Sequence, residues 1–276
     1  GAVGTCSSYL QLHTQNNDIL KSFVGLDELD KNTCIKIRDK ALEYLGLKSE
    51  LITTQVKSRL DISGHTFALC QIASVLERLS KEIRNLQRTE IGEIFEEFSE
   101  GQVGSSTMPQ KRNPHKSERI TGIARVIRSQ LGSVMETIAL EHERDLTNSS
   151  VERIELQTTN VLTHYILKEM KILLSTLKVD TVSVEKNLNI EQGRQLSERI
   201  MLYLVEKKIC KSRQDAHEVL KQASSLPNFK QFVIDYIHTH QNSLMKFVRS
   251  EETENLFNPH TYIGVAQELI DRVLTS

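Results

Sequence analysis

The sequence contains few of the residues that interrupt regular structure. Glycine accounts for 12 of its 276 residues and proline for 4, about 4% and about 1.4%, against usual frequencies of about 7% and about 5%. So few chain-breaking residues mean few tight turns, which favours long helices and argues against a many-stranded sandwich or barrel. We therefore expect an all-α fold.

An excess of charge of one sign is also lacking, because 35 Lys and Arg residues nearly balance 36 Asp and Glu residues. This balance argues against a nucleic-acid-binding protein on overall charge, although a local basic patch stays open. The cysteines lie far apart and form no C-x-x-C pair; they are Cys6, Cys34, Cys70 and Cys210. Such spacing is typical of reduced thiols in a cytoplasmic protein and of neither a disulfide framework nor a zinc site.

Long apolar runs are absent as well. No run approaches the about 18 residues of a membrane-spanning helix, and no signal peptide opens the sequence. The histidines show no H-E-x-x-H or other ligand spacing. We expect no metal, no cofactor, and neither a nucleic acid nor a membrane as partner. The first residues, GAVGT, lack an initiator methionine, so we expect a piece of a longer protein.

Apolar residues recur at helical spacing along the first part of the chain. The helices that this spacing predicts are 27–44, 62–86, 115 to about 140, and 150–177. Asn113 is predicted to cap the third of these, with Pro114 as its first helical residue, and Ser149-Ser150-Val151-Glu152 has the pattern of a capping box for the fourth. Residues 90–100 are predicted to be an acidic helix end with solvated glutamates.

Shorter helices are predicted after Lys178. Their ranges are 183–190, 195–207, 212–224, 228–249 and 261–274. The change in helix length suggests two domains, with the boundary at Val179-Asp180-Thr181. Residues 1–178 would form a bundle of long helices, and residues 179–276 a small carboxyl-terminal helical domain.

The stretch GQVGSSTMPQKRNP at 101–114 breaks the helical pattern with two glycines and two prolines, which predicts a loop. Gly104 and the serines can offer backbone N–H groups to a carboxylate, while Lys111 supplies a positive charge and Asn113 an amide. A serine needs an activating environment before it removes a proton, and Lys111 with the adjacent helix N-terminus would supply one. The alternative is an ordinary surface loop with solvated Lys111 and Arg112.

A second group of residues is suited to a phosphate. Ser149 lies at the predicted start of a helix, whose free N–H groups favour an anion, and Arg153 follows one turn later. Arg144 approaches from the preceding turn. A hydroxyl, helix N–H groups and two guanidinium groups would form a phosphate site. The alternative is a helix cap with two exposed arginines.

The loop carries a family resemblance. GSSTMPQKRNP at 104–114 resembles the signature GSSxMPxKxN of the fumarase/aspartase superfamily, with all seven specified positions present. Its continuation KRNPHKSER and the segment EHERDLTNSSVER at 141–153 resemble the adenylosuccinate lyase family. GAVGT, TTQVKSRLD, SRQDAHE and NPHTYIG are also similar to that family. The resemblance implies a long-helix bundle, here incomplete, and a homotetramer whose active sites each combine three subunits.

That family cleaves adenylosuccinate to AMP and fumarate, and the succinyl-carboxamide ribotide to the carboxamide ribotide and fumarate, by β-elimination in purine nucleotide synthesis. By resemblance, Ser105 is the general base. Lys111 and Asn113 stabilise the doubly charged intermediate. Ser106 and the backbone around Met108 hold the fumarate carboxylates.

The resemblance also assigns residues outside the loop. Glu118 matches a carboxylate associated with the catalytic histidine, and Gln55 a glutamine that contacts the succinyl part. Arg119 matches a further substrate-binding arginine. The phosphate ligands would be Arg144, Ser149 and Arg153.

Other interpretations remain. Argininosuccinate lyase and carboxymuconate cycloisomerase share the loop, but their substrates carry no phosphate, which disfavours both. A third interpretation is a non-catalytic helical assembly module. The absence of the family's acid histidine, which lies upstream of the GAVGT motif, favours it. We expect this chain to lack the amino-terminal catalytic histidines.

Overall fold

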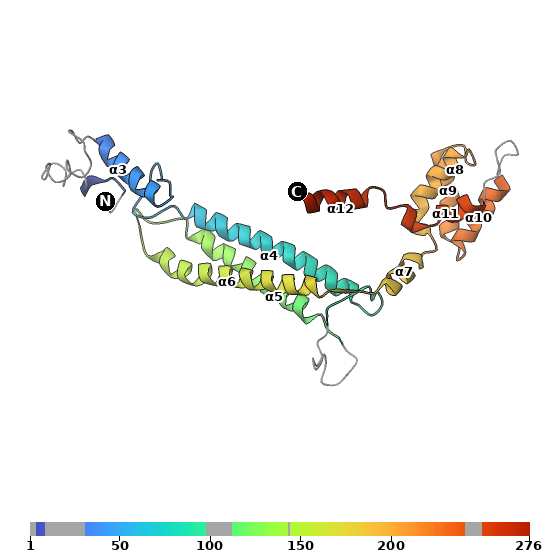
Figure 1. Cartoon of the computed structure of the whole chain (residues 1–276), viewed down its shortest axis with the longest axis horizontal. Coiled ribbons are helices and arrows are strands. Elements are labelled where there is room, and N and C mark those ends of the chain that lie inside the picture. The colour runs from blue at the N-terminus through green and yellow to red at the C-terminus, as the bar shows by residue number, and fades with distance from the viewer. Residues whose placement is uncertain (1–3, 9–30, 98–111, 143, 241–249) are drawn as a thin grey trace. The chain divides into compact units, whose positions relative to one another are not determined.

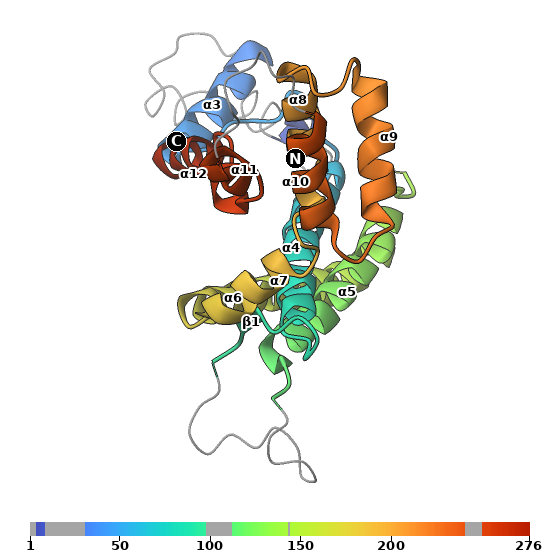
Figure 2. The same cartoon turned by 90° about the vertical axis from the view of Figure 1, so that its right-hand side faces the viewer.

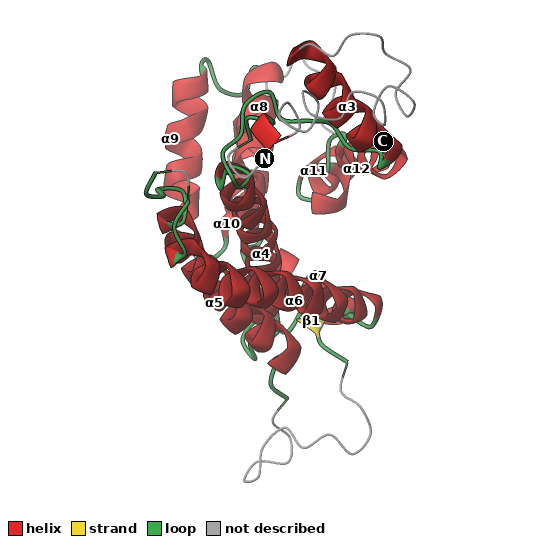
Figure 3. Cartoon of the chain, turned by 90° about the vertical axis from the view of Figure 1, so that its left-hand side faces the viewer, coloured by secondary structure: helices red, strands yellow, loops and turns green. Residues whose placement is uncertain are grey.

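The computed structural model describes residues 4–8, 31–97, 112–142, 144–240 and 250–276. The chain divides into two compact units: Gly1–Gln87 with Phe95–Lys178, and Arg88–Ile94 with Val179–Ser276. Helices dominate both units (Figure 3), and the predicted all-α fold is confirmed. No helix in the described ranges is long and apolar enough to cross a membrane.

Three long helices form the body of the first unit. They are α4 (Leu60–Leu86), α5 (His115–Glu136) and α6 (Thr147–Ser175), and α3 (Lys31–Tyr44) precedes them. The three lie side by side in two perpendicular views (Figures 1 and 2). The buried residues of α4 recur every three or four positions: Ser63, Thr66, Cys70, Ala73, Glu77, Ser80 and Ile83. This periodicity explains why the apolar pattern located the helix correctly.

The interior of this bundle contains polar as well as apolar side chains. Within the described residues, several fully buried hydroxyls have no hydrogen-bond partner: Thr66, Ser80, Thr121, Thr159 and Thr163. Large apolar side chains are exposed on the same helices, including Val75 on α4 (66%) and Val161 on α6 (65%). These exposed side chains offer apolar surface for further packing.

The second unit consists of shorter helices around its own core. They are α7 (Thr181–Asn189), α8 (Ser197–Glu206), α9 (Arg213–Ser224), α10 (Phe229–His240), α11 (Ser250–Leu256) and α12 (Ala266–Thr275), with 3-10 turns η1 (Arg194–Leu196) and η2 (Pro259–Thr261). The Phe229 and Phe257 rings meet edge to face, with centroids 6.4 Å apart. Gly193 has a φ of 87°, and a Cβ there would lie 2.7 Å from the Phe257 ring, so this close approach requires glycine.

The predicted helices of the second unit are largely confirmed. The expected helix over 228–249 is confirmed as far as His240, and residues 241–249 lie outside the described ranges. The expected helix over 261–274 begins only at Ala266, because η2 occupies its predicted start. The sequence pattern missed α11.

The predicted acidic helix end at 90–100 is wrong over its described part, residues 90–97. Gly92 adopts a left-handed φ of 64°, which ends any helix. Ile94–Phe95 then forms strand β1, which pairs with β2 (Lys178–Val179). Glu96 is only 5% exposed and therefore does not lie on a solvated face.

Both predicted helix caps are wrong. α5 begins at His115 with Pro114 in the cap position, and no side chain of the cap residue bonds to the helix. α6 begins at Thr147, so Ser149 lies inside its first turn rather than at the cap. α5 also ends at Glu136, four residues before the expected end.

A buried carboxylate joins α4 to α5. Glu77 is 6% exposed and pairs with Lys81 on its own helix, at 2.9 Å, and with Arg128 on α5. Burial pushes the pKa of Glu77 upward, but hydrogen bonds from Lys81 and Arg128 outweigh burial and hold the pKa below its ordinary value of 4.5. The ionised carboxylate is therefore favoured in the folded state.

Glu77→Gln is expected to lower the free energy of unfolding at pH 7 by about 2 kcal/mol, because charge-assisted hydrogen bonds are lost. A carboxyl group whose pKa is lowered on folding stabilises the protein at pH values above its pKa in the unfolded state. That stabilisation disappears as the pH falls through its pKa in the folded state. The difference between the two proteins should therefore shrink below pH 4.5. Urea unfolding of both proteins, at pH 7 and below pH 4.5, measures this difference in the free energy of unfolding. Glu82→Gln, at an exposed position of α4, is the control and should change stability by less than about 0.5 kcal/mol.

Candidate active site

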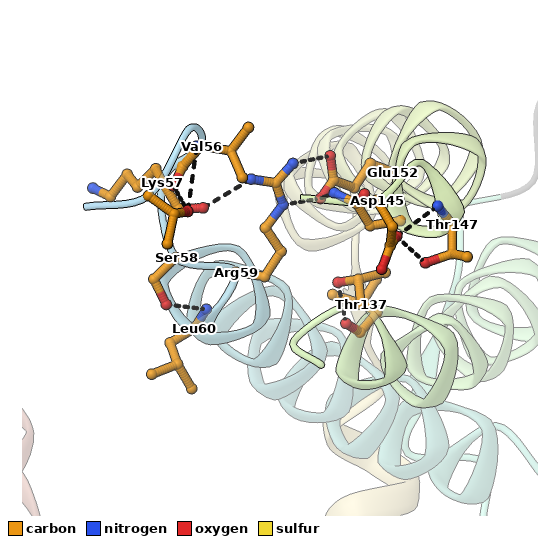
Figure 4. A network of polar contacts seen from close by, with 12 residues as sticks. Val56, Lys57, Ser58, Arg59, Leu60, Thr137, Asp145, Thr147 and Glu152 are labelled. Atoms are coloured by element: carbon orange, nitrogen blue, oxygen red, sulfur yellow. Dashed lines mark hydrogen bonds and ion pairs between the residues drawn. The ribbon is translucent and has the colours of Figure 1, made fainter. Parts of the chain in front are cut away.

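One end of the bundle is fixed by an ion pair between α6 and the start of α4 (Figure 4). Arg59 Nε donates to Glu152 Oε1 at 2.5 Å and Nη2 donates to Oε2 at 3.1 Å. Both side chains are largely buried, at 13% and 17% exposed. Asn148 Nδ2 also donates to Glu152 Oε1, at 3.1 Å. This bidentate geometry sets the start of α4 beside the start of α6.

The proposed phosphate ligands lie at this end. Ser149 and Arg153 flank Glu152 and are four residues apart on α6, so they share one helix face. Arg144 lies just before the helix. Both arginines are exposed, and neither has a partner among the residues that the structure describes. Gln55, in the exposed segment before Arg59, belongs to the same end.

The turn that carries Arg144 is held by a carboxylate. Asp145 accepts hydrogen bonds from the backbone N–H of Glu141 at 2.7 Å and of Thr147 at 2.8 Å (Figure 4). The bond from Glu141, followed by those from Thr147, lowers the pKa of Asp145. His142, within this turn, is exposed and has a left-handed φ of 50°. Asp145 therefore ties the backbone of Glu141 to that of Thr147, on either side of Arg144.

The residues that directly follow the loop lie at the other end of the bundle. Ser105, Ser106, Met108 and Lys111 lie outside the described residues. Asn113 is half-buried beside the start of α5, and Glu118 is exposed on the first turn of that helix.

Arg119, the further substrate ligand expected from the resemblance, is already engaged. Its Nη1 donates to Tyr165 Oη at 3.0 Å and to Glu169 Oε2 at 3.3 Å, both on α6. The hydrogen bond to Tyr165 is the main cause that raises the pKa of Arg119. Arg119 is therefore a link between α5 and α6, and it remains half exposed.

The two ends are far apart within one copy of the chain. Glu169, the partner of Arg119, follows Ser149 by 20 residues on the same helix, which corresponds to about 30 Å at 1.5 Å per residue. A small-molecule pocket of about 1,000 Å³ is only about 10 Å across. The structure thus gathers Gln55, Arg144, Ser149 and Arg153 at one end. It gathers Asn113, Glu118 and Arg119 at the other.

Sequence reasoning missed Glu96, which lies at the loop end. Its carboxylate accepts hydrogen bonds from the N–H groups of Lys116 and Ser117 and from the Ser117 hydroxyl. Gly92 could have indicated this, because glycine disfavours a continuous helix through the acidic stretch in which Glu96 lies. Within the described residues, no group of His, Cys, Asp or Glu side chains is arranged to hold a metal ion.

The chain matches known lyases over most of its length. A family model described as a lyase matches residues 30–129. Adenylosuccinate lyase from Methanocaldococcus jannaschii is 40% identical over 241 residues, which cover 87% of this chain and 52% of that protein. The enzyme of the same name from Pyrococcus abyssi is 38% identical over 257 residues, covering 92% and 56%. The chain therefore spans about half the length of the curated relatives it matches.

Solved structures share the fold. The 3-carboxy-cis,cis-muconate lactonizing enzyme from Pseudomonas putida matches with a TM-score of 0.74 and 24% identity, over 88% of this chain and 54% of that one. A fumarate lyase from Mesorhizobium sp. BNC1 matches with a TM-score of 0.71 and 19% identity, over 89% and 55%. At these identities the likeness concerns the fold alone. In sequence the chain is similar to adenylosuccinate lyases over most of its length, and in fold it is similar to solved lyases.

Proposed function

We propose that the protein is an adenylosuccinate lyase, which cleaves adenylosuccinate to AMP and fumarate and the succinyl-carboxamide ribotide to the carboxamide ribotide and fumarate. The observation that carries this proposal is the identity of 35–40% to proteins named adenylosuccinate lyase, over 84–92% of this chain. The four free cysteines are consistent with a cytoplasmic location.

The chemistry is assigned to the loop end. Ser105 removes the proton from the carbon next to a succinyl carboxylate, and Lys111 and Asn113 stabilise the dianion that forms. Fixed cations and donors are the largest contribution to such a step, because the proton is barely acidic without them. Ser106 and the backbone at Met108 hold the carboxylates. The leaving nitrogen takes a proton from an acid, a histidine in this family, and Glu118 is associated with it.

The phosphate is assigned to the opposite end. Arg144 and Arg153 are exposed cations without a partner in the described ranges, and Ser149 lies in the first turn of α6, at the positive end of the helix dipole. Gln55, at the same end, contacts the succinyl part of the substrate. A phosphate site favours a nucleotide over the phosphate-free substrates of argininosuccinate lyase and carboxymuconate cycloisomerase.

The separation of the two ends supports an oligomer with shared sites. Because about 30 Å of helix lies between them, a complete site combines the loop end of one copy with the phosphate end of another. Exposed apolar side chains such as Val75, Ile154 and Val161 supply surface for that association. We propose a homotetramer of the kind the family forms. A non-catalytic assembly module would need the same surface but would leave Arg144 and Arg153 without a role.

Arg153→Ala is expected to weaken the binding of AMP and adenylosuccinate about ten- to a hundredfold, because it removes one charge-assisted contact of about 1.5–3 kcal/mol. Fumarate binding should change much less, since the phosphate is remote from the bond that breaks. Titration calorimetry of the full-length protein with AMP and with fumarate measures both.

Inorganic phosphate provides the control for this variant. It should compete with AMP in the unaltered protein and lose that ability in Arg153→Ala. Equal weakening of AMP and fumarate would assign Arg153 to the succinyl end. Unchanged binding of both would make it a solvated helix residue.

Mixing two inactive variants tests the shared site. Ser105→Ala removes the base at one end, and the double variant Arg144→Ala with Arg153→Ala removes the phosphate ligands at the other. Random re-assembly of the two should restore about a quarter of the wild-type turnover, because that fraction of sites combines an intact end from each variant. Each variant re-assembled alone should stay inactive, as should the mixture if both ends of a site came from one copy.

A further inference from the structure

Glu96 is a buried carboxylate that no assigned role yet uses. It is 5% exposed and lies directly after strand β1. Its Oε1 accepts from Ser117 N at 2.8 Å and from Ser117 Oγ at 2.6 Å, and its Oε2 accepts from Lys116 N at 3.0 Å. A buried carboxylate costs free energy unless its oxygens are satisfied, and here both oxygens are.

These bonds give α5 the cap that its own sequence lacks. The first N–H groups of a helix have no partner within the helix. Pro114, in the cap position, forms no side-chain bond to it. Glu96 therefore caps the helix from a segment 20 residues earlier in the chain, and its negative charge also suits the positive end of the helix dipole.

Gln87 adds a second attachment at the same place. This residue is the C-cap of α4. Its Nε2 donates to the backbone carbonyl of Arg112 at 3.2 Å, and its Oε1 accepts from the backbone N–H of Glu96 at 3.1 Å. The side chain of Gln87 thus links the backbone of Glu96 to the backbone of Arg112. The side chain of Glu96 in turn links its own segment to the start of α5.

We propose that Glu96, supported by Gln87, is a positioning residue for the elimination reaction, an inference that rests on the proposed function. Asn113 directly follows Arg112, whose carbonyl Gln87 binds, and lies within four residues of Lys116 and Ser117, whose N–H groups Glu96 binds. Groups that stabilise a developing dianion act only at a fixed position, and a misplacement of about 1 Å costs about a hundredfold in rate. Glu96 acts through the backbone that it holds and makes no contact with substrate.

The test compares Glu96→Ala, Glu96→Gln and Glu97→Gln in the full-length protein. Glu97 is the matched control, because it is the adjacent residue, is exposed and pairs only with Lys178 among the described residues, at 3.5 Å. Glu96→Ala should speed hydrogen exchange at the N–H groups of Lys116 and Ser117 about tenfold or more, while the N–H of Glu118, which bonds to Pro114 O, keeps its rate. The exchange rates in Glu96→Gln should lie between those of the wild type and Glu96→Ala, since glutamine retains one acceptor oxygen.

Steady-state kinetics with adenylosuccinate provide the second measurement. Glu96→Ala should lower kcat about ten- to a hundredfold with KM within about threefold of wild type. Glu96→Gln should recover part of the loss, and Glu97→Gln should keep the wild-type values. Ser117→Ala, which removes only the hydroxyl bond, gives a milder variant and should lower kcat less if Glu96→Ala does not fold.

The outcomes separate the two proposals. Faster exchange in Glu96→Ala with an unchanged kcat would overturn the positioning role, as would unchanged exchange at Lys116 and Ser117. A loss in Glu97→Gln equal to that in Glu96→Gln would reduce the effect to charge alone and also overturn it. If the unaltered protein does not cleave adenylosuccinate, the proposed function fails and the positioning role fails with it, while the exchange result still decides whether Glu96 caps α5.

Discussion

The rigid length of three packed helices is the constraint on which the rest of the first unit depends. α4, α5 and α6 contain 27, 22 and 29 residues, and a helix rises about 1.5 Å per residue. Groups at the two ends cannot approach one another unless the helices break. The bundle therefore keeps Arg144 and Arg153 at one end and Asn113, Glu118 and Arg119 at the other, and this separation is why we propose a site assembled between copies.

Three largely buried carboxylates hold this bundle in register, and each is satisfied in a different way. Glu152 meets a guanidinium in bidentate geometry and ties α6 to the start of α4. Glu77 meets an arginine and a lysine and ties α4 to α5. Glu96 meets helix N–H groups and ties residue 96 to α5. A charge removed from water must be paired, so each carboxylate specifies which segments lie together.

The interior hydroxyls and exposed apolar side chains of the bundle belong to one pattern. Thr66, Thr159 and Thr163 occupy buried positions, and small side chains let helices approach closely. Large apolar residues such as Ile120, Ile127 and Ile166 fill the rest of the interior, while others, such as Val75 and Val161, lie on outer faces, where further packing would bury them. The second unit has its own aromatic and aliphatic core around Phe229 and Ile200.

The sequence alone located most of the helices and showed which family the chain resembles. Helix formation depends on the spacing of neighbouring residues, so apolar periodicity located α4, α8 and α9 within two residues. The signature loop is likewise a contiguous pattern, and it pointed to the family without any knowledge of the fold.

Only the tertiary structure decided how the helix ends are satisfied and where the site residues lie. Ser149 and Glu152 have the spacing of a capping box, yet Glu152 binds Arg59, 93 residues away in sequence. Glu96 appeared to be one of several solvated glutamates, yet it caps a helix that begins 19 residues later, at His115. Local pattern cannot identify such partners, because pairing a buried charge depends on which distant segment the packing brings beside it. For the same reason, the linear order of Gln55, Asn113 and Arg153 did not reveal that Asn113 lies at the opposite end of the bundle from the other two.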